Sequence, residues 1–499
     1  MSAKVTFIMG RSGSGKTELI LNRIKQNELN GRRSVLIVPD RASFESEKRL
    51  SGLMGHGIMN TFVVSFTRLA RRILSERGEK RVFLSMQGRQ MLLRRTIEEH
   101  GTELKAFSRI ALRQGFTGEC DEIILKCKRF GITPEQLASA AGDESLPLSL
   151  RDKLRDFALI FEKTADAMAE SYIDDEDVVN SLISELPESS YRDCDFFIDT
   201  PETLTEQSIR IISVLFGCVP SVTISFRGDT SESCRDRRLF APDEELYRRI
   251  RNEASEQGCE IEFISLTDNR RARSPELIHL ERELFAFPYR RFTAPASEPA
   301  AIELHTAGSR IQEVAACAEP IRRAVRGGLR YRDIGIIVSD TEVYAPIIGR
   351  TFPDYGIPFF MDAKRVLFAH PIAELLLASL NCCESGFRAQ SFIRAIKSGL
   401  FPVEAADIER LENHILKYGL NGNLITEPFD QADVPEGVEE ARAAAVGPLM
   451  GLKQHVSGRM RSSERIEAVY AFLEELRIGE KLRQECTALA EAGDLTAAR

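Results

Sequence analysis

A glycine-rich stretch near the start of the chain has the residue types and spacing of a phosphate-binding loop. The sequence GRSGSGKT follows the β-type run at 5–9 and precedes a helical pattern at 18–26. In such a strand, loop and helix unit, glycines let the backbone amides turn toward a phosphate, and the helix N-terminus adds partial positive charge. We expect the lysine to reach the β- and γ-phosphates and the threonine to ligate Mg²⁺. The predicted ATP-binding residues are Gly10, Arg11, Ser12, Gly13, Ser14, Gly15, Lys16 and Thr17.

A carboxylate at the end of a second apolar run could complete this site. The run Asp195–Ile198 ends at Asp199, which we predict to share the Mg²⁺ with the P-loop threonine. The next residue is Thr200 rather than glutamate, so the usual general base for water is absent. Glu202 or Glu206 could take that role only if the loop folded back toward the phosphates. No catalytic residue is therefore assigned beyond Asp199.

Other short apolar runs indicate the elements that must position these groups. Helical patterns separate runs rich in β-branched residues at 34–38, 61–64 and 221–226. Alternating strands and helices predict an α/β fold with a doubly wound parallel sheet, whose ligands bind at the carboxyl ends of the strands. Residues 40–44 and 65–68 follow two of these strands. We therefore expect them at the same edge of the sheet as the P-loop.

Positive charge is concentrated just after the run at 61–64. Residues 66–95 contain nine Lys and Arg residues and two Glu residues, a net charge of +7. Arg68, Arg71 and Arg72 lie within about one helical turn and close to Phe66, a mixture that can bind phosphates and stack bases of a single strand. A solvated helix face explains the charge count equally well. The segment is thus a candidate nucleic-acid surface, with that alternative open.

The overall composition limits the classes of protein to which the chain can belong. Its 499 residues exceed one domain of roughly 150 residues, which indicates several domains. A net charge of −8 argues against a wholly basic nucleic-acid coat protein. The longest apolar stretches, such as 211–219, fall short of the roughly 20 residues that a membrane span needs, so we expect a cytoplasmic protein with no membrane partner. The ten scattered cysteines form no CxxC pair and are expected to be reduced thiols.

Several further stretches resemble one family in order along the chain. They are VPDRASFESE at 38–47, SFTRLARRIL at 65–74, LSMQGRQMLLRRTIEEH at 84–100, RYRDIGIIVSD at 330–340, GIPFFMD at 356–362 and His370-Pro371. Together with the P-loop and the Asp199 strand, they resemble a superfamily 1 helicase core. More closely, the chain resembles the B subunit of the AddAB-type ATP-dependent helicase-deoxyribonucleases.

The resemblance implies a division of the chain into domains. A first RecA-like domain is expected to be split between 1–104 and 191–295 by a helical insertion at 105–190. A second RecA-like domain is expected to begin at 296–380, with its first strand at 334–338. A further helical insertion is expected at 381–499. Because the chain stops inside a helical pattern without a capping signal, we expect it to be a fragment of a longer protein.

The resemblance also implies a function in DNA repair. Members of the family pair with a helicase-nuclease A subunit, process double-strand DNA ends for recombination as ATP-dependent helicases and exonucleases, and hold the Chi sequence as a single strand. The residues at the corresponding positions, with the basic segment, are Arg41, Ser43, Phe44, Phe66, Arg68 and Arg71. The chain departs from the family at Arg41 and Arg71. The family's nuclease domain and its iron–sulfur cluster, held by four cysteines, are expected beyond residue 499.

Two alternative functions follow from the same residues. The first is a fully active ATP-driven DNA translocase in which Glu202 or Glu206 orients water. Against it, only nine residues precede Gly10, Thr200 follows the metal aspartate, and Ser339 stands where active helicases often have a phosphate-contacting arginine. The second is a small-molecule P-loop kinase, which the chain length disfavours. ATP binding without efficient turnover by this subunit is the leading hypothesis.

Overall fold

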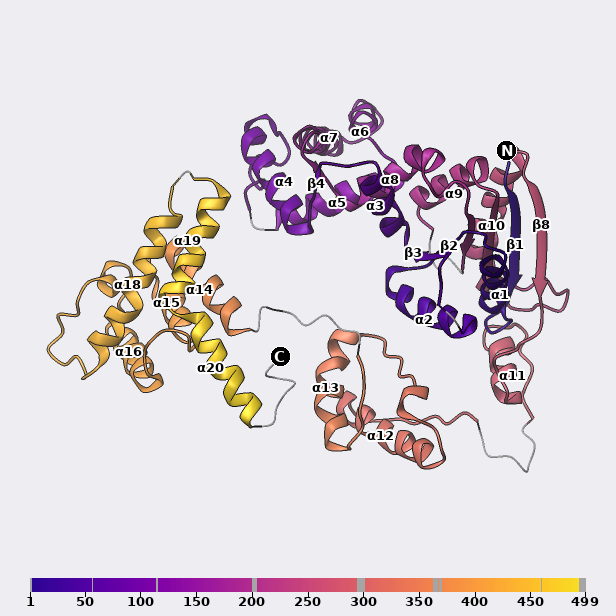
Figure 1. Ribbon diagram of the computed structural model, residues 1–499. Helices are drawn as coiled ribbons and strands as arrows, with labels where there is room; N and C mark the ends of the chain where they lie inside the picture. Colours follow the sequence, from indigo (N-terminus) through magenta and orange to yellow (C-terminus); the bar gives the residue numbers. More distant parts are fainter. Residues whose placement is uncertain are drawn as a thin grey trace. The chain divides into compact units, whose positions relative to one another are not determined.

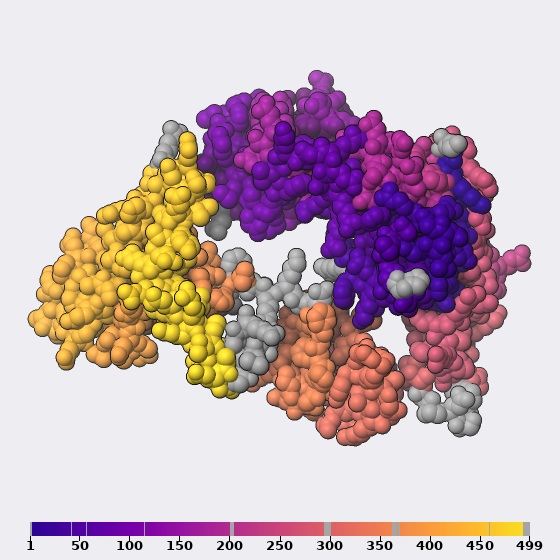
Figure 2. Space-filling view, in the orientation of Figure 1, coloured from indigo at the N-terminus to yellow at the C-terminus, as the bar shows by residue number. Residues whose placement is uncertain are grey.

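The computed structural model describes two units of this chain, residues 1–304 and 305–499. The described residues are 2–55, 57–113, 115–199, 204–293, 301–361, 367, 370–458 and 460–492. Figure 1 traces the elements of each unit, and Figure 2 shows their surfaces, coloured from indigo at the N-terminus to yellow at the C-terminus. Within the described part of the chain, no helix is long and apolar enough to cross a membrane.

A six-stranded parallel sheet organises the first unit. Its order is β3-β2-β6-β7-β1-β8. The strands are β1 (Lys4–Gly10), β2 (Ser34–Ile37), β3 (Thr61–Val64), β6 (Asp195–Ile198), β7 (Ser221–Arg227) and β8 (Glu260–Leu266). The fold class predicted from the sequence, an α/β P-loop domain of RecA-like type with a doubly wound parallel sheet, is confirmed. The edge strand β8 was not predicted, because its Glu-Ile-Glu-Phe pattern is only half apolar and half buried.

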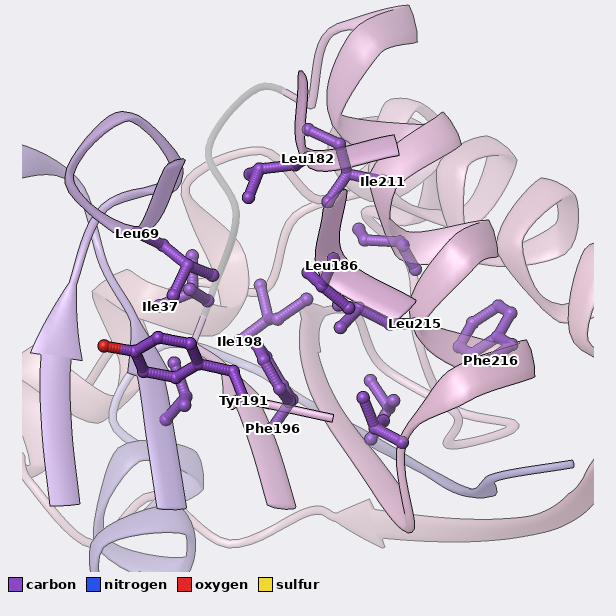
Figure 3. Close-up of a cluster of buried hydrophobic side chains, with 14 of the residues drawn as sticks. Ile37, Leu69, Leu182, Leu186, Tyr191, Phe196, Ile198, Ile211, Leu215 and Phe216 are labelled. Carbon is purple, nitrogen blue, oxygen red and sulfur yellow. The ribbon is translucent and has the colours of Figure 1, made fainter. Parts of the chain in front are cut away.

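Helices cover both faces of this sheet, because successive strand side chains point to opposite sides. Phe7, Phe196 and Ile37 face one core with helices α3 (Phe66–Glu76), α8 (Asp175–Glu185), α9 (Glu206–Cys218) and α10 (Arg237–Glu256). Figure 3 shows Phe196 and Ile198 against Ile211 and Leu215 in this core. Ile8, Leu36 and Phe197 face a second core with α1 (Lys16–Leu29) and α2 (Ser43–Met54). The helix α11 (Pro275–Glu283) and the short η1 (Asp40–Ala42) and η3 (Leu186–Glu188) complete this domain.

A helical layer is inserted between β3 and β6. It comprises α4 (Met86–His100), α5 (Phe116–Phe130), α6 (Pro134–Ala140) and α7 (Leu148–Met168), with η2 (Gly101–Glu103) and a two-stranded pair of β4 (Val82–Phe83) and β5 (Tyr172–Ile173). Leu93 and Ile97 of α4 pack with Ile124 of α5 and Phe161 of α7. Because α4 packs with α5 and α7, the helical layer includes residues before position 105, where the insertion was expected to start. The helix α8 packs instead against α3 and the sheet, because its apolar face fits that core.

The regular elements among the described residues of the second unit are all helices. The helices α12 (Arg310–Arg326) and α13 (Thr341–Asp354), with η4 (Tyr331–Asp333), enclose a small core that includes Val314 and Phe352. Seven further helices share a larger core: α14 (Pro371–Ser385), α15 (Ala389–Ile396), α16 (Ala405–Tyr418), α17 (Asn423–Thr426), α18 (Val438–Val456), α19 (Ser462–Glu475) and α20 (Ile478–Glu491). His370 and Pro371 stand at the start of α14, and the His370 side chain accepts a hydrogen bond from the backbone N–H of Ile372.

The strand expected at 334–338 does not form in the structure. These residues are not in a strand, and the side chain of Ile337 is fully exposed. A parallel strand is held by the hydrogen-bond ladder of its neighbours, and the described residues of this unit include no strand that could provide one. The β-type sequence of this segment is therefore insufficient by itself.

Candidate nucleotide and DNA site

The P-loop turns sharply between β1 and α1, and two glycines make this turn possible. A side chain at Gly10 would place its Cβ 2.4 Å from the Ser14 hydroxyl oxygen and 2.8 Å from the carbonyl oxygen of Leu266. Gly15 has φ 95°, in the left-handed region that favours glycine. The buried Ser14 hydroxyl has no hydrogen-bond partner within the described structure. The turn thus places the loop backbone and the unpaired Ser14 hydroxyl next to the N-terminus of α1.

Lys16 lies within this loop rather than in solvent. Its Nζ donates hydrogen bonds of 2.8 Å and 2.9 Å to the carbonyl oxygens of Gly10 and Arg11. Burial lowers the pKa of the Lys16 ammonium below its ordinary 10.5, while the charge of Asp199 opposes this shift. A cation held by two carbonyls beside a helix N-terminus is placed to exchange these acceptors for phosphate oxygens.

Thr17 and Asp199 are in direct contact, as a shared Mg²⁺ site requires. The Thr17 hydroxyl donates to one carboxylate oxygen of Asp199 at 2.6 Å, and the hydroxyl of Ser225 on β7 donates to the other at 2.7 Å. Hydroxyl and carboxylate oxygens are hard ligands of the kind that Mg²⁺ prefers, so these residues fit the metal. Thr200 and Glu202 lie outside the described residues.

The other carboxylates considered for catalysis are bound elsewhere. Both oxygens of Glu206 accept hydrogen bonds of 2.5 Å from Arg249 on α10, and these bonds lower the pKa of Glu206. Asp229, at the end of β7, forms an ion pair of 3.2 Å with Arg11. Glu206 is therefore not placed as a water-orienting base, because its charge is already compensated on the surface of α10.

Sequence reasoning missed a basic loop that lies on the P-loop. The backbone N–H of Arg270 donates to the carbonyl oxygen of Gly13 at 2.8 Å, and the Arg271 guanidinium donates to the Ser12 hydroxyl at 2.8 Å. Their positive charge can therefore act on a bound phosphate. The sequence NRRAR at 269–273 closely follows β8. This cluster of arginines is the signal that could have revealed the loop, but the strand before it was not recognised.

Part of the predicted DNA-contact set is also brought together at this edge of the sheet. Arg68 pairs with Asp40 at 3.2 Å and donates to the Ser43 hydroxyl at 3.1 Å, while Ser65 donates to the same Asp40 carboxylate at 2.7 Å. Phe44 is 73% exposed. These contacts join the starts of α2 and α3 into one polar cluster. The placement of the Arg41 side chain lies outside the described part of the structure.

The two remaining predicted DNA contacts are engaged within the protein. Phe66 is half-buried against the core of the sheet. Arg71 pairs with Asp175 of α8 at 2.5 Å, and its guanidinium lies over the Phe83 ring at 5.4 Å. Both side chains are less exposed than Phe44.

The net positive charge of residues 66–95 is largely compensated in the fold. Seven of its nine basic residues form ion pairs with carboxylates: Arg68, Arg71, Arg77, Arg81, Arg89, Arg94 and Arg95. Several of these partners, such as Asp40, Asp121 and Asp175, lie outside the segment, so its charge alone could not reveal them. Much of the positive charge expected on this surface is therefore paired with carboxylates, although side chains such as Arg68 and Arg95 stay exposed.

The fold and the site together define a class of protein. A phosphate-binding loop between the first strand and helix of a parallel sheet, with an aspartate at the end of a nearby strand, is the arrangement of a RecA-like P-loop nucleotide-binding domain.

Comparison with known proteins narrows this class to one family. The family model described as "ADDB, N-terminal" matches residues 7–281, more than half of the chain, and the chain belongs to this family. A relative from Geobacillus kaustophilus, named as the B subunit of an ATP-dependent helicase/deoxyribonuclease, is 35% identical over 99% of this chain. Proteins of the same name from Alkaliphilus metalliredigens and Bacillus subtilis are each 30% identical, over 98% and 96% of this chain. The chain spans 44% to 46% of the length of these relatives.

Proposed function

We propose that this chain binds ATP together with Mg²⁺ at the P-loop edge of its parallel sheet. The observation that carries the proposal is the direct contact between Thr17 of the P-loop and Asp199 at the end of β6. The buried Lys16 ammonium and the orphaned Ser14 hydroxyl support it, because both lie where phosphate oxygens are received. The printed name of the relatives, which includes "ATP-dependent", agrees with a nucleotide site.

Each group in the site has a distinct role in this proposal. The amides at the N-terminus of α1 surround the β-phosphate, and Lys16 transfers its hydrogen bonds from loop carbonyls to phosphate oxygens. Thr17 and Asp199 hold the Mg²⁺, which neutralises phosphate charge when it is bound. Arg270, whose side chain lies beside Gly15, and Arg271, which bonds Ser12, provide further positive charge at the loop.

At the level of the whole protein, we propose the B subunit of a heterodimeric helicase-nuclease. With an A subunit, it would process double-strand DNA ends for recombinational repair in the cytoplasm, and this subunit would hold a single DNA strand, including Chi. The cluster of Asp40, Ser43 and Arg68 supports a strand site, since it lies at the same sheet edge as the P-loop. The exposed ring of Phe44 beside it offers a face for base stacking.

A second candidate is an active ATP-driven translocase, and one observation favours it. Arg270 and Arg271 lie on the P-loop, where a cation can stabilise charge that develops on a transferred phosphoryl group. The engagement of Glu206 by Arg249 favours nucleotide binding with little turnover. Nothing in the fold favours the small-molecule kinase.

Nucleotide binding and turnover by the chain test these proposals. We expect Mg²⁺ and ADP or ATP to bind the unmodified chain, Lys16→Ala to abolish binding, and Lys25→Ala, on the same helix α1, to leave it unchanged. Phosphate release is then measured with and without single-stranded DNA. Slow release in both conditions supports the leading proposal, whereas strong stimulation by DNA supports the translocase. Nucleotide binding that persists in Lys16→Ala would show that the nucleotide binds outside the P-loop.

A further inference from the structure

Arg11, the second residue of the P-loop, has its side chain enclosed by acidic groups. The side chain is 7% exposed. Its guanidinium forms two bonds with Asp236, at 2.6 Å and 2.9 Å, and one of 3.2 Å with Asp229. Its Nε–H is shared between both oxygens of the Glu281 carboxylate, at 2.9 Å and 3.0 Å. It also donates to the carbonyl oxygen of Glu281 at 2.8 Å, and it lies 5.1 Å from the centre of the Phe240 ring.

This environment requires an arginine rather than any cation. The Nε–H and both nitrogens of the fork have acceptors, so the five N–H groups are all used. A lysine has three donors at one point and cannot span three separated carboxylates. The cluster combines one positive charge with three carboxylates, and the hydrogen bonds from Arg11 lower the pKa of Asp236. Removing the guanidinium would leave these carboxylates partly buried and unpaired.

The three carboxylates come from three different elements. Asp229 follows β7, Asp236 lies at the start of α10, and Glu281 lies in α11. The backbone of Arg11 remains part of the phosphate loop, where its carbonyl oxygen accepts a hydrogen bond from Lys16. One residue therefore connects the nucleotide cradle with the loop after β7 and with α11.

The helix α11 depends on such polar ties for its position. None of its side chains is buried, and Leu277 and Leu280 are 41% and 39% exposed. Besides Arg11, Arg235 anchors this helix through Glu283. The loop that carries Arg270 and Arg271 leads directly into α11. Without apolar burial to hold the helix, the contact between Arg11 and Glu281 becomes a main constraint on where that basic loop lies.

We propose that Arg11 is a positioning residue that holds α11, and with it Arg270 and Arg271, over the phosphate end of the nucleotide site. The proposal rests on the proposed nucleotide binding and deepens it. The Arg271 guanidinium bonds the Ser12 hydroxyl, and the Arg270 side chain lies beside Gly15, whereas the Lys16 ammonium is held by the carbonyl oxygens of Gly10 and Arg11. In this proposal the two arginines act mainly on the terminal phosphate. Loss of Arg11 then weakens the preference for a triphosphate over a diphosphate more than it weakens binding itself.

The test compares the affinities of the 499-residue chain for a non-hydrolysable ATP analogue and for ADP, both with Mg²⁺. We expect Arg11→Lys to weaken binding of the analogue by about tenfold or more and binding of ADP by less than about threefold. A second variant, Glu281→Gln, leaves both bonds between Arg11 and Asp236 in place and serves if Arg11→Lys fails to fold. We expect it to lower the ratio of the affinity for the analogue to the affinity for ADP. Arg89→Lys disturbs a buried Arg–Asp pair in the helical layer and should lower the melting temperature without changing the ratio.

The outcomes separate the two proposals. If the unmodified chain binds neither nucleotide, the proposed function fails. If it binds both but Arg11→Lys and Glu281→Gln leave the ratio unchanged, or lower both affinities equally, the positioning role of Arg11 is wrong while the nucleotide site stands. A ratio that falls in these two variants and not in Arg89→Lys supports the role.

Discussion

The hydroxyl of Thr17 donates a hydrogen bond of 2.6 Å to the carboxylate of Asp199, although β7 separates the strands β1 and β6 that lead to these residues. Ser225, on the intervening strand β7, holds the second oxygen of the same carboxylate at 2.7 Å. The order of the strands thus brings the oxygen atoms of Thr17 and Asp199, both of a kind that can bind Mg²⁺, into contact, although the two residues are 182 positions apart in the sequence. This relationship leads to the first of four predictions.

We expect Asp199→Asn to weaken nucleotide binding only when Mg²⁺ is present, by about tenfold, because an amide is a poorer Mg²⁺ ligand than a carboxylate. Titrations of ATP with Mg²⁺ and with a chelator would measure this difference. Asp195→Asn is the control at the other end of β6. Asp195 is buried and binds Asn27, Arg32 and Ser221, so its change should lower the melting temperature and leave the Mg²⁺ dependence intact. An equal loss of nucleotide affinity with and without Mg²⁺ would contradict a role of Asp199 in binding the metal.

The lowered pKa of Lys16 makes nucleotide affinity depend on pH. Only the ammonium attracts phosphate, so affinity for ADP should fall as pH rises through a pKa below the ordinary 10.5. Stability should change in the opposite direction. In this range the unfolded chain binds the lysine proton more tightly than the folded chain, so the free energy of unfolding without nucleotide rises with pH. Affinity of the unmodified chain for ADP, measured from about pH 7 to about pH 10 at constant ionic strength, tests the first sign, and a flat profile would be contrary to the burial of this group. The free energy of unfolding over the same pH range, compared with that of Lys16→Met, tests the second sign.

Asp40 should limit the binding of single-stranded DNA by competing for Arg68. Asp40→Asn is expected to strengthen binding several-fold at low salt, because it frees the Arg68 guanidinium for a phosphate. Arg68→Ala is expected to weaken binding and to reduce the slope of log affinity against log salt by about 0.7. Fluorescence anisotropy with a labelled oligonucleotide measures both. Arg95→Ala, an exposed cation paired with Glu99 on α4, is the control. Identical affinities for Asp40→Asn and Arg68→Ala would place the strand elsewhere.

The pair of Arg89 and Asp121 should be important for the stability of the helical layer. The two side chains are 9% and 4% exposed, and they are joined by bonds of 2.5 Å and 2.9 Å between α4 and α5. Arg89→Met leaves a buried carboxylate unpaired, which costs about 3 to 5 kcal/mol. Urea unfolding followed by circular dichroism measures this loss. Arg95→Met, which breaks only a solvated pair, should have no measurable effect. A similar midpoint in both variants would show that water reaches the Arg89 pair.

The local features of this protein could be predicted from its sequence. The P-loop, the strand before it, the helix after it and the run that ends at Asp199 are encoded by residues adjacent in the chain, whose apolar pattern and glycine spacing act over a few positions. The parallel orientation of the strands follows from the alternation of strands and helices. The ten cysteines are free thiols, as their spacing indicated.

The tertiary structure alone decided which charges are neutralised and which segments become strands. Arg11 and Glu281 are 270 positions apart, and no local pattern connects them. The ion pair between Arg71 and Asp175 likewise depends on the packing of α8 against α3, which the residues around Arg71 do not encode. The strand expected at 334–338 shows the same principle, since a strand needs a neighbour and its own residues cannot supply one. Ion pairing and sheet ladders depend on distances between remote residues, and these distances exist only once the chain has folded.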